Sequence, residues 1–375
     1  MYTPYNEALQ DDTESIQALL DRGGDVFLPE GTYQICRTLK IRDNTAFHLA
    51  HGAVIRLADG ANCVMLENEG LHERRRNHRI TLSGGIWDGN NAHQTRIEAE
   101  TVYDDLRFFG IALRFAGVDD LHITALTIKD PESYSLQLCD VERFTIEHIT
   151  FDHNLLRPNM DGVHVQGPAR FGRIYDIKGA TNDDMVALTS DCGPNDEYTR
   201  GVVSDIAIDG LFAECGYTAV RLLSCGNPLR NVSICNIFGT FRFYAVSFTH
   251  HDIHPGEPIL LENVTVRNVF VSKPVRLPDE ANTFFYPPSH AHYADTEPLI
   301  WFAPGITARN VVIADVHRAE DSQTHATTVL VDRDARVKGL VLRDITQRFT
   351  VCPPQPTLKI LGEVDGLVKD TVQEL

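Results

Sequence analysis

Two short segments carry carboxylates at a spacing that suits acid–base chemistry. One, NMDGVHV, spans residues 159–165, and the other, NDDMVAL, spans residues 182–188. Aligning their hydrophobic positions places Asp161 on Asp184, a separation of 184 − 161 = 23 residues. Stacked parallel strands lie ~4.8 Å apart, so a repeat of this length would bring the two segments side by side. We therefore expect Asp161, Asp183 and Asp184 to cluster at one edge of a sheet.

Three carboxylates this close repel one another, so the pKa of at least one should rise. A carboxylic acid that keeps its proton near neutral pH, next to a carboxylate that activates water, is what glycoside hydrolysis requires. The alternative interpretation is that these are turn residues, because Asp is common at chain corners. The convergence of all three favours a catalytic site.

Other polar residues near these segments are candidates for binding substrate. Strand alternation points His164 outward beside Asp161, where it is expected to bind sugar hydroxyls or tune the aspartates; a satisfied surface histidine is the alternative. Asn159 and Asn182, which open the two segments, are expected to bind substrate too. The run HHDIH at 250–254 has no spacing that fixes three ligands on one face, so no metal and no other cofactor is predicted.

A gapless repeat indicates the fold. Residues 112–128 (ALRFAGVDDLHITALTI) match residues 135–151 (SLQLCDVERFTIEHITF) at the same offset of 23, with Leu113 on Leu136. Each short run alternates with period two, as half-buried strands do. Three short strands per unit, separated by tight bends, describe one coil of a solenoid. The sequence therefore predicts an all-β fold: a single-stranded right-handed parallel β-helix.

Later units keep this pattern, with an asparagine before each of three strands: Asn231, Asn263 and Asn310. Asparagine tolerates the left-handed conformation that a coil corner needs, and stacked asparagines could hydrogen-bond along the axis. The whole chain, 1–375, is expected to be one β-helix domain. Residues 272–297 read as a long loop insertion whose aromatic residues could contact sugars, close the groove or meet another subunit.

The N-terminal segment, about residues 1–35, is expected to cap the solenoid. Asp12 or Thr13 can begin a short helix that runs through Leu20, with Ile16, Leu19 and Leu20 on one face. Strands follow at 26–29 and 31–33. A solenoid end exposes apolar surface and unpaired strand edges, which a short helix can cover.

The opening Asp12-Thr13, then VFLPEGTY at 26–33, and SGGIWDGN at 83–90 resemble pectin-degrading β-helix enzymes. These are glycoside hydrolase family 28 (polygalacturonase-like) and the pectate-lyase-like group, and the resemblance runs from about residue 11 to residue 250. Family 28 carries N-T-D and, one coil on, G-D-D. The resemblance implies that Asp161, Asp183 and Asp184 are its three catalytic aspartates, with Asp184 as general acid and the other two holding the water.

The resemblance breaks on the next two coils. The family continues with G-H-G and R-I-K, whereas Thr218 stands here in place of the histidine, and Ser247 and Thr249 stand in place of the two cations. Those cations hold a uronate carboxylate, so a galacturonate substrate is in doubt. Arg221, in the column of Ser247 one coil earlier, and Arg242 are candidates for a displaced positive charge; solvated surface arginines are the alternative.

The amino-acid composition argues against several classes of function. The formal net charge of −18 lacks the basic footprint of a nucleic-acid-binding protein. No apolar run is long enough to span a membrane. The chain begins without a signal-peptide pattern, and its eight cysteines form no CxxC pair, so a cytoplasmic location is expected.

These features predict a glycosidase that cleaves a plant-type oligo- or polysaccharide, by inversion as the family resemblance implies, with a carbohydrate as its partner and a homo-oligomer left open. One alternative is a β-helix lyase or transglycosylating enzyme. A lyase needs a Lys or Arg base, and cations are sparse in these columns. A non-catalytic carbohydrate-binding or tailspike-like protein is the other alternative, and it would not need three converging carboxylates.

Overall fold

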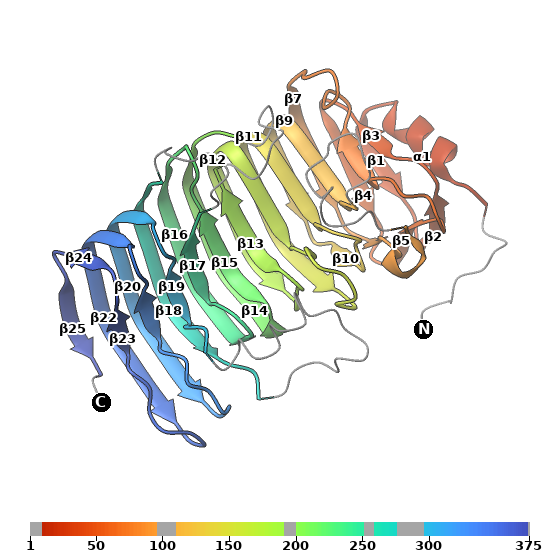
Figure 1. Cartoon of the computed structure of the whole chain (residues 1–375). Helices are drawn as coiled ribbons and strands as arrows, with labels where there is room; N and C mark the ends of the chain where they lie inside the picture. The colour runs from red at the N-terminus through yellow and green to blue at the C-terminus, as the bar shows by residue number, and fades with distance from the viewer. Residues whose placement is uncertain (1–9, 96–109, 191–199, 251–258, 276–295, 374–375) are drawn as a thin grey trace.

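The computed structural model describes residues 10–95, 110–190, 200–250, 259–275 and 296–373. Within them the chain forms a right-handed parallel β-helix, with each strand paired in parallel to strands one coil before and after it. Figure 1 shows the coils following one another from the helix α1 at the N-terminal end to β25 at the other end. The expected fold class is confirmed. The described residues hold no helix long and apolar enough to cross a membrane.

Three faces of the coil carry the strands. The first sheet holds the carboxylate segments and consists of β3 (Leu39–Ile41), β6 (Leu66–Asn68), the first parts of β9 (Leu113–Thr124), β11 (Leu136–Asp152) and β12 (Val163–Lys178), then β13 (Asp184–Thr189), β15 (Thr218–Leu223), β17 (Val246–Thr249), β19 (Ile300–Phe302), β21 (Val329–Val331) and β23 (Leu358–Ile360).

The long strands bend round corners and continue into the other two sheets. The second sheet begins with β1 (Gly24–Leu28), β4 (Thr45–Leu49) and β7 (Asn77–Ser83), and the third with β2 (Gly31–Ile35), β5 (Ala53–Leu57), β8 (Ile86–Asp88) and β10 (Thr127–Lys129). The second sheet continues through β9, and both continue through β11 and β12 into β14 (Val203–Gly216), β16 (Leu229–Phe241), β18 (Leu261–Ser272), β20 (Thr307–Glu320) and β22 (Arg336–Phe349), which β24 (Glu363–Asp365) and β25 (Val368–Val372) flank.

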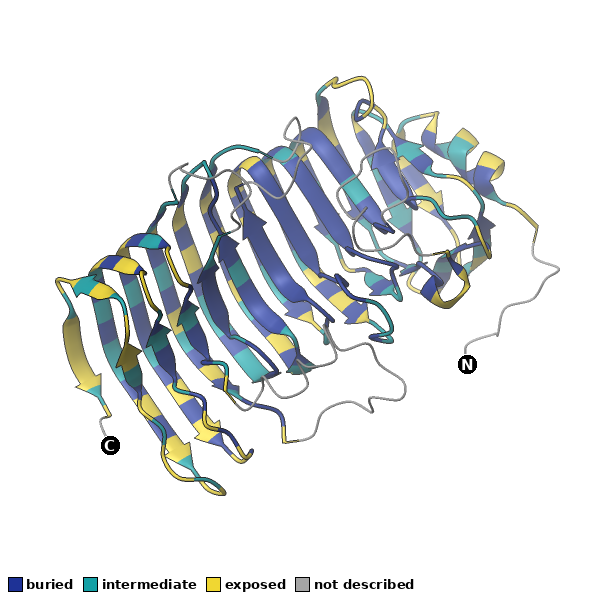
Figure 2. Cartoon of the chain, viewed as in Figure 1, coloured by how far each residue is buried: buried dark blue, intermediate teal, exposed yellow. Residues whose placement is uncertain are grey.

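The core follows the predicted register. Leu113 pairs with Leu136 and both are fully buried, which confirms the offset of 23 residues as one coil. The same inward column continues through Val163 and Val186. Figure 2 shows the resulting stripes, with buried positions alternating with more exposed ones along many of the strands. Alternation along each strand places apolar side chains inside the helix. The outward-facing positions of the first sheet are then available for polar, functional side chains.

Asparagines form a corner ladder, as expected. Asn231, Asn263 and Asn310 have φ values of 57°, 57° and 53°, in the left-handed region. The Asn263 side-chain amide donates to Asn231 Oδ1 at 2.9 Å, and that of Asn310 donates to Asn263 Oδ1 at 3.1 Å. Each side chain thus satisfies the next one while its backbone makes the turn.

The cap is a helix, α1 (Thr13–Leu20), which buries Ile16 and Leu20 against the end of the core. Its first turn differs in one detail from the expectation. Asp12 Oδ2 accepts a hydrogen bond from the Gln34 backbone N–H at 2.9 Å, and Asp11 Oδ1 accepts from the Thr13 N–H at 3.0 Å. Asp12 is the N-cap residue, as expected, but its side chain ties the helix to β2 and makes no capping hydrogen bond.

Candidate active site

The register of β12 and β13 brings the carboxylate segments together. Val163 pairs with Val186, and the Gly162 N–H donates to the Asp184 carbonyl at 2.9 Å, so Asp161 lies one coil from Asp184. Asp161, Asp183 and Asp184 are 1%, 8% and 2% exposed and line one pocket of about 530 Å³. That volume lies in the range of small-molecule sites. The spacing inferred from sequence is confirmed.

The pocket crosses the edge of the first sheet from β12 toward β19. Beyond the carboxylates, it is lined by Asn159, Thr218, Arg221, Ser247 and Thr249, and by five aromatic residues: Tyr134, Tyr217, Phe243, Tyr244 and Trp301. Several of the aromatic rings stack in pairs, with centroids 4.2 Å apart for Tyr217 and Phe243 and 4.9 Å apart for Tyr244 and Trp301. The pocket therefore contains a cluster of carboxylates beside a row of five aromatic side chains, which we call the aromatic wall.

Burial and repulsion raise all three carboxyl pKa values. Burial and repulsion from Asp161 raise the pKa of Asp183 to about 7. Burial raises the pKa of Asp184 to about 7 as well, against the opposing charge of Arg221. The pKa of Asp161 lies well above its ordinary value, because the group is buried and Asp184 repels its charge. The cluster therefore retains protons near neutral pH, as a proton donor in hydrolysis must.

Arg221 is the cation that enters the cluster. Its Nε lies 2.8 Å from Asp184 Oδ2, and its side chain is 20% exposed against 2% for the aspartate. Register places it beside Ser247, as its column predicted. Asp184 also pairs with Thr218, the residue that stands in the family's histidine position. Arg221 thus partly offsets the negative charge of the site and still reaches solvent.

His164 lies beneath Asp161 and does not line the pocket. It occupies the outward column opposite Ala187 but is completely buried. Its Nδ1 lies 2.7 Å from Asp161 Oδ2, and its ring stacks on Tyr134 with centroids 4.2 Å apart. Burial excludes the surface-histidine interpretation, and the contact with Asp161 leaves a tuning role for His164 as a prediction.

The remaining predicted site residues separate into two groups. Asn159 lines the pocket, with a backbone φ of 55°. Asn182 and Arg242 are buried outside the pocket lining, where the Arg242 guanidinium donates to Asn182 Oδ1 at 2.8 Å. Asn182 also donates to the Arg157 carbonyl at 2.8 Å, so this pair braces the corner that presents Asp183. Arg242 is thus not a solvated surface arginine.

Sequence reasoning missed the aromatic wall. Trp301 pairs with Ser247 in the register of β19 and β17, so it continues the outward column that contains His164 and Arg221. Its position could have been inferred only by counting coils across the insertion at 272–297. Residues 276–295 of that insertion, and residues 251–254 of the histidine run, lie outside the described residues. His250 does line the pocket.

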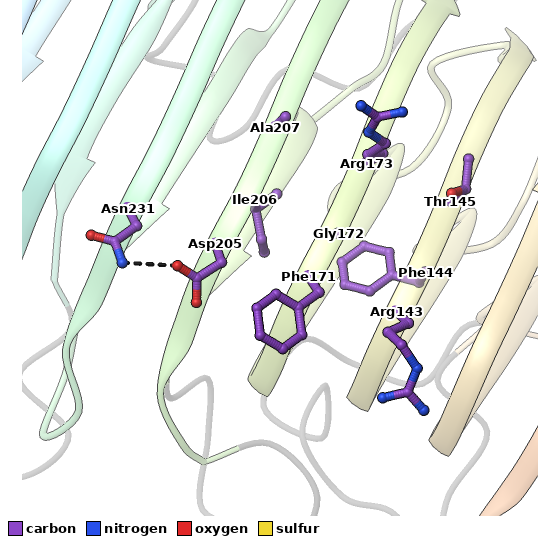
Figure 3. A pocket seen from close by; sticks show the side chains of 10 residues that line it. All are labelled: Arg143, Phe144, Thr145, Phe171, Gly172, Arg173, Asp205, Ile206, Ala207 and Asn231. Carbon is purple, nitrogen blue, oxygen red and sulfur yellow. Dashed lines mark hydrogen bonds between the residues drawn. The ribbon is translucent and has the colours of Figure 1, made fainter.

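A second pocket of about 550 Å³ lies on the second sheet, lined by residues of β11, β12, β14 and β16 (Figure 3). Its lining contains one carboxylate, Asp205, which accepts a hydrogen bond from the Asn231 amide at 2.8 Å. That bond and a second from Ser204 lower the pKa of Asp205. A carboxylate held ionised cannot donate a proton, so this pocket is not the candidate active site.

Comparison with solved structures supports the same fold. A family 28 exopolygalacturonase from Yersinia enterocolitica aligns over 96% of this chain and 76% of its own, with a TM-score of 0.54 and 12% identity. One from Thermotoga maritima covers 96% and 88%, with a TM-score of 0.53 and 11% identity. The A-module of a mannuronan C-5 epimerase from Azotobacter vinelandii covers 96% of both chains, with a TM-score of 0.56 and 13% identity.

No family model matches the sequence. No curated protein matches it. The structural matches establish that the chain shares the right-handed β-helix fold of these proteins. Because hydrolases and an epimerase share that fold, the fold alone does not select the reaction.

Proposed function

We propose that this protein is a glycoside hydrolase that cleaves an oligo- or polysaccharide by acid–base catalysis at Asp161, Asp183 and Asp184. One observation carries the proposal: three buried carboxyls share one pocket and have raised pKa values. A carboxyl that holds its proton can protonate the leaving oxygen, and an ionised neighbour can take a proton from water.

We assign the proton donor to Asp184 and the positioning of water to Asp161 and Asp183. Water attacks the anomeric carbon, the bond to the leaving oxygen breaks, and that oxygen takes the Asp184 proton. Arg221, 2.8 Å from Asp184, favours the carboxylate that remains after the proton has left. We propose an inverting outcome, in which the product first appears with the opposite anomeric configuration.

The proposed substrate carries no uronate at the cleavage site. Ser247 and Thr249 replace the family's two cations in the pocket lining, and Arg221 is already paired with Asp184. The aromatic wall offers apolar surface to sugar rings instead. The same shortage of cations disfavours elimination, which needs a basic Lys or Arg.

The test is a screen of neutral and acidic oligosaccharides with two readouts, new reducing ends and the ultraviolet absorbance of an unsaturated product. Hydrolysis gives reducing ends without absorbance, whereas elimination gives both. On a cleaved substrate, D161N, D183N and D184N should each lose ~10²–10⁴-fold in rate, because each removes a titratable group with little change of shape. Near-normal turnover in all three variants would reject this site.

The stereochemical proposal is tested on the same substrate. Proton NMR of the first product should show the anomer opposite to the substrate's, before mutarotation mixes the two. The substrate's own anomer as first product would mean retention, which requires a carboxylate nucleophile.

A further inference from the structure

The Asp161 carboxyl has two unequal oxygens. Oδ2 is 2.7 Å from His164 Nδ1, with both side chains almost wholly buried. Oδ1 is also buried, and no neighbouring described residue hydrogen-bonds it. A buried acceptor without a protein partner is unusual and calls for an explanation. Asp161 lines the pocket, and a water molecule or a sugar hydroxyl bound there would supply the missing donor.

We propose that His164 is a positioning residue that holds Asp161 by Oδ2 and presents Oδ1 to the attacking water. This inference rests on the proposed hydrolytic function. In the step, a water proton passes to Asp161 Oδ1 as the water oxygen bonds to the anomeric carbon. Asp184 supplies its proton to the leaving oxygen, so the active site as a whole gains and loses one proton.

Neighbouring side chains from two adjacent coils restrict the rotation of the His164 ring. Tyr134 stacks on its ring, Gln137 lies opposite on β11, and Thr189 Oγ1 of β13 lies 3.4 Å from Nε2. The ionisable groups around it are Asp161 just before its own strand, Tyr134, and on the next coil Asp184 with its partner Arg221. The contact of 2.7 Å between Nδ1 and Oδ2 is a hydrogen bond, so the ring fixes the orientation of the Asp161 carboxyl.

The chemical need for this contact follows from burial. A carboxyl buried beside Asp184 tends to keep its own proton and would then be unable to accept one from water. Donation of Nδ1–H to Oδ2 stabilises the ionised form of Asp161. His164 thereby lets a deeply buried carboxyl act as a base.

The first experiment compares H164L, which has no donor, with H164N, whose side-chain amide can donate from the position of Nδ1. On the substrate found by the screen, H164L should lose about 10- to 100-fold in kcat with little change in KM, the scale of one hydrogen bond to a charged group. The acidic limb of its pH profile should move to higher pH. H164N should recover most of the rate.

Unchanged kcat and pH profile in H164L would overturn the proposal, and so would equal losses in H164L and H164N. The second experiment needs no substrate. Proton NMR of the full chain should show a strongly deshielded Nδ1–H signal that disappears in D161N and persists in D183N. Absence of that signal in the native chain would also overturn the proposal, whereas near-normal hydrolysis in D161N, D183N and D184N alike would reject the proposed catalytic site itself.

Discussion

Replacing Asp183 by Asn should stabilise the protein at alkaline pH while abolishing its activity. The pKa of Asp183 rises from its ordinary value of 3.8 to about 7, chiefly because the side chain is buried. The folded state therefore holds the proton more tightly than the unfolded chain does. Ionisation of Asp183 then opposes folding, and its cost grows as pH rises from about 4 to about 7.

The magnitude follows from that difference. Each pH unit between the two pKa values is worth about 1.4 kcal/mol, so the full cost above pH 7 is about 4 kcal/mol, falling below ~1 kcal/mol at pH 4. Asparagine removes the charge and keeps the oxygen that accepts the Asp184 N–H at 3.0 Å. For a chain of this length, a gain of about 4 kcal/mol corresponds to ~5 °C in the thermal midpoint.

The assay is thermal unfolding of native protein and D183N at pH 8 and pH 4, followed by circular dichroism. D25N is the matched control, because Asp25 is exposed on β1 and its replacement should change neither midpoint. The reasoning is refuted if D183N is no more stable than the native protein at pH 8. A gain of the same size at both pH values would also refute it, since the stabilisation would then not come from the charge.

Three further outcomes are expected. Hydrolysis should fall above about pH 7, because Asp184, with a pKa of about 7, then loses the proton that the leaving oxygen needs, and a rate that keeps rising to pH 9 would contradict this. Polygalacturonate should be a poor substrate; its rapid hydrolysis by both R221A and R242A would show that charge recognition is misassigned. L138A should lose about 2–5 kcal/mol in denaturant unfolding, since Leu138 is fully buried, and a loss below ~1 kcal/mol would mean that the core is not continuous there.

The sequence predicted best those contacts that follow from the repeated geometry of the coils. The offset of 23 residues that places Leu113 on Leu136 also places Asp161 one coil before Asp184, because a solenoid applies one register rule throughout. The alignment of outward-facing positions on successive coils likewise predicted that Arg221 lies beside Ser247. These relations depend only on strand alternation and coil length, both of which are visible in the pattern of hydrophobic residues.

Contacts made between coils at the corners could not be predicted in the same way. His164 was expected on the outer face, and it does occupy the outward column, but the ring of Tyr134 from the preceding coil covers it. Arg242 turns beneath the sheet to reach Asn182. Both outcomes depend on the conformation of short connections, which hydrophobic periodicity does not encode.

The asparagine ladder has a consequence for how such a protein can grow. In the ladder, Asn263 accepts a hydrogen bond from Asn310 of the following coil and donates one to Asn231 of the preceding coil. The same side-chain amide therefore meets both neighbouring coils. A corner built in this way can be repeated over any number of coils with the same hydrogen bond between neighbours. Duplication of one whole coil in that half of the chain would lengthen the surface available to a polymer. It would leave Asp161 and Asp184, which lie earlier in the chain, at their present separation. The ladder thus makes the length of the molecule a trait that can evolve independently of its chemistry.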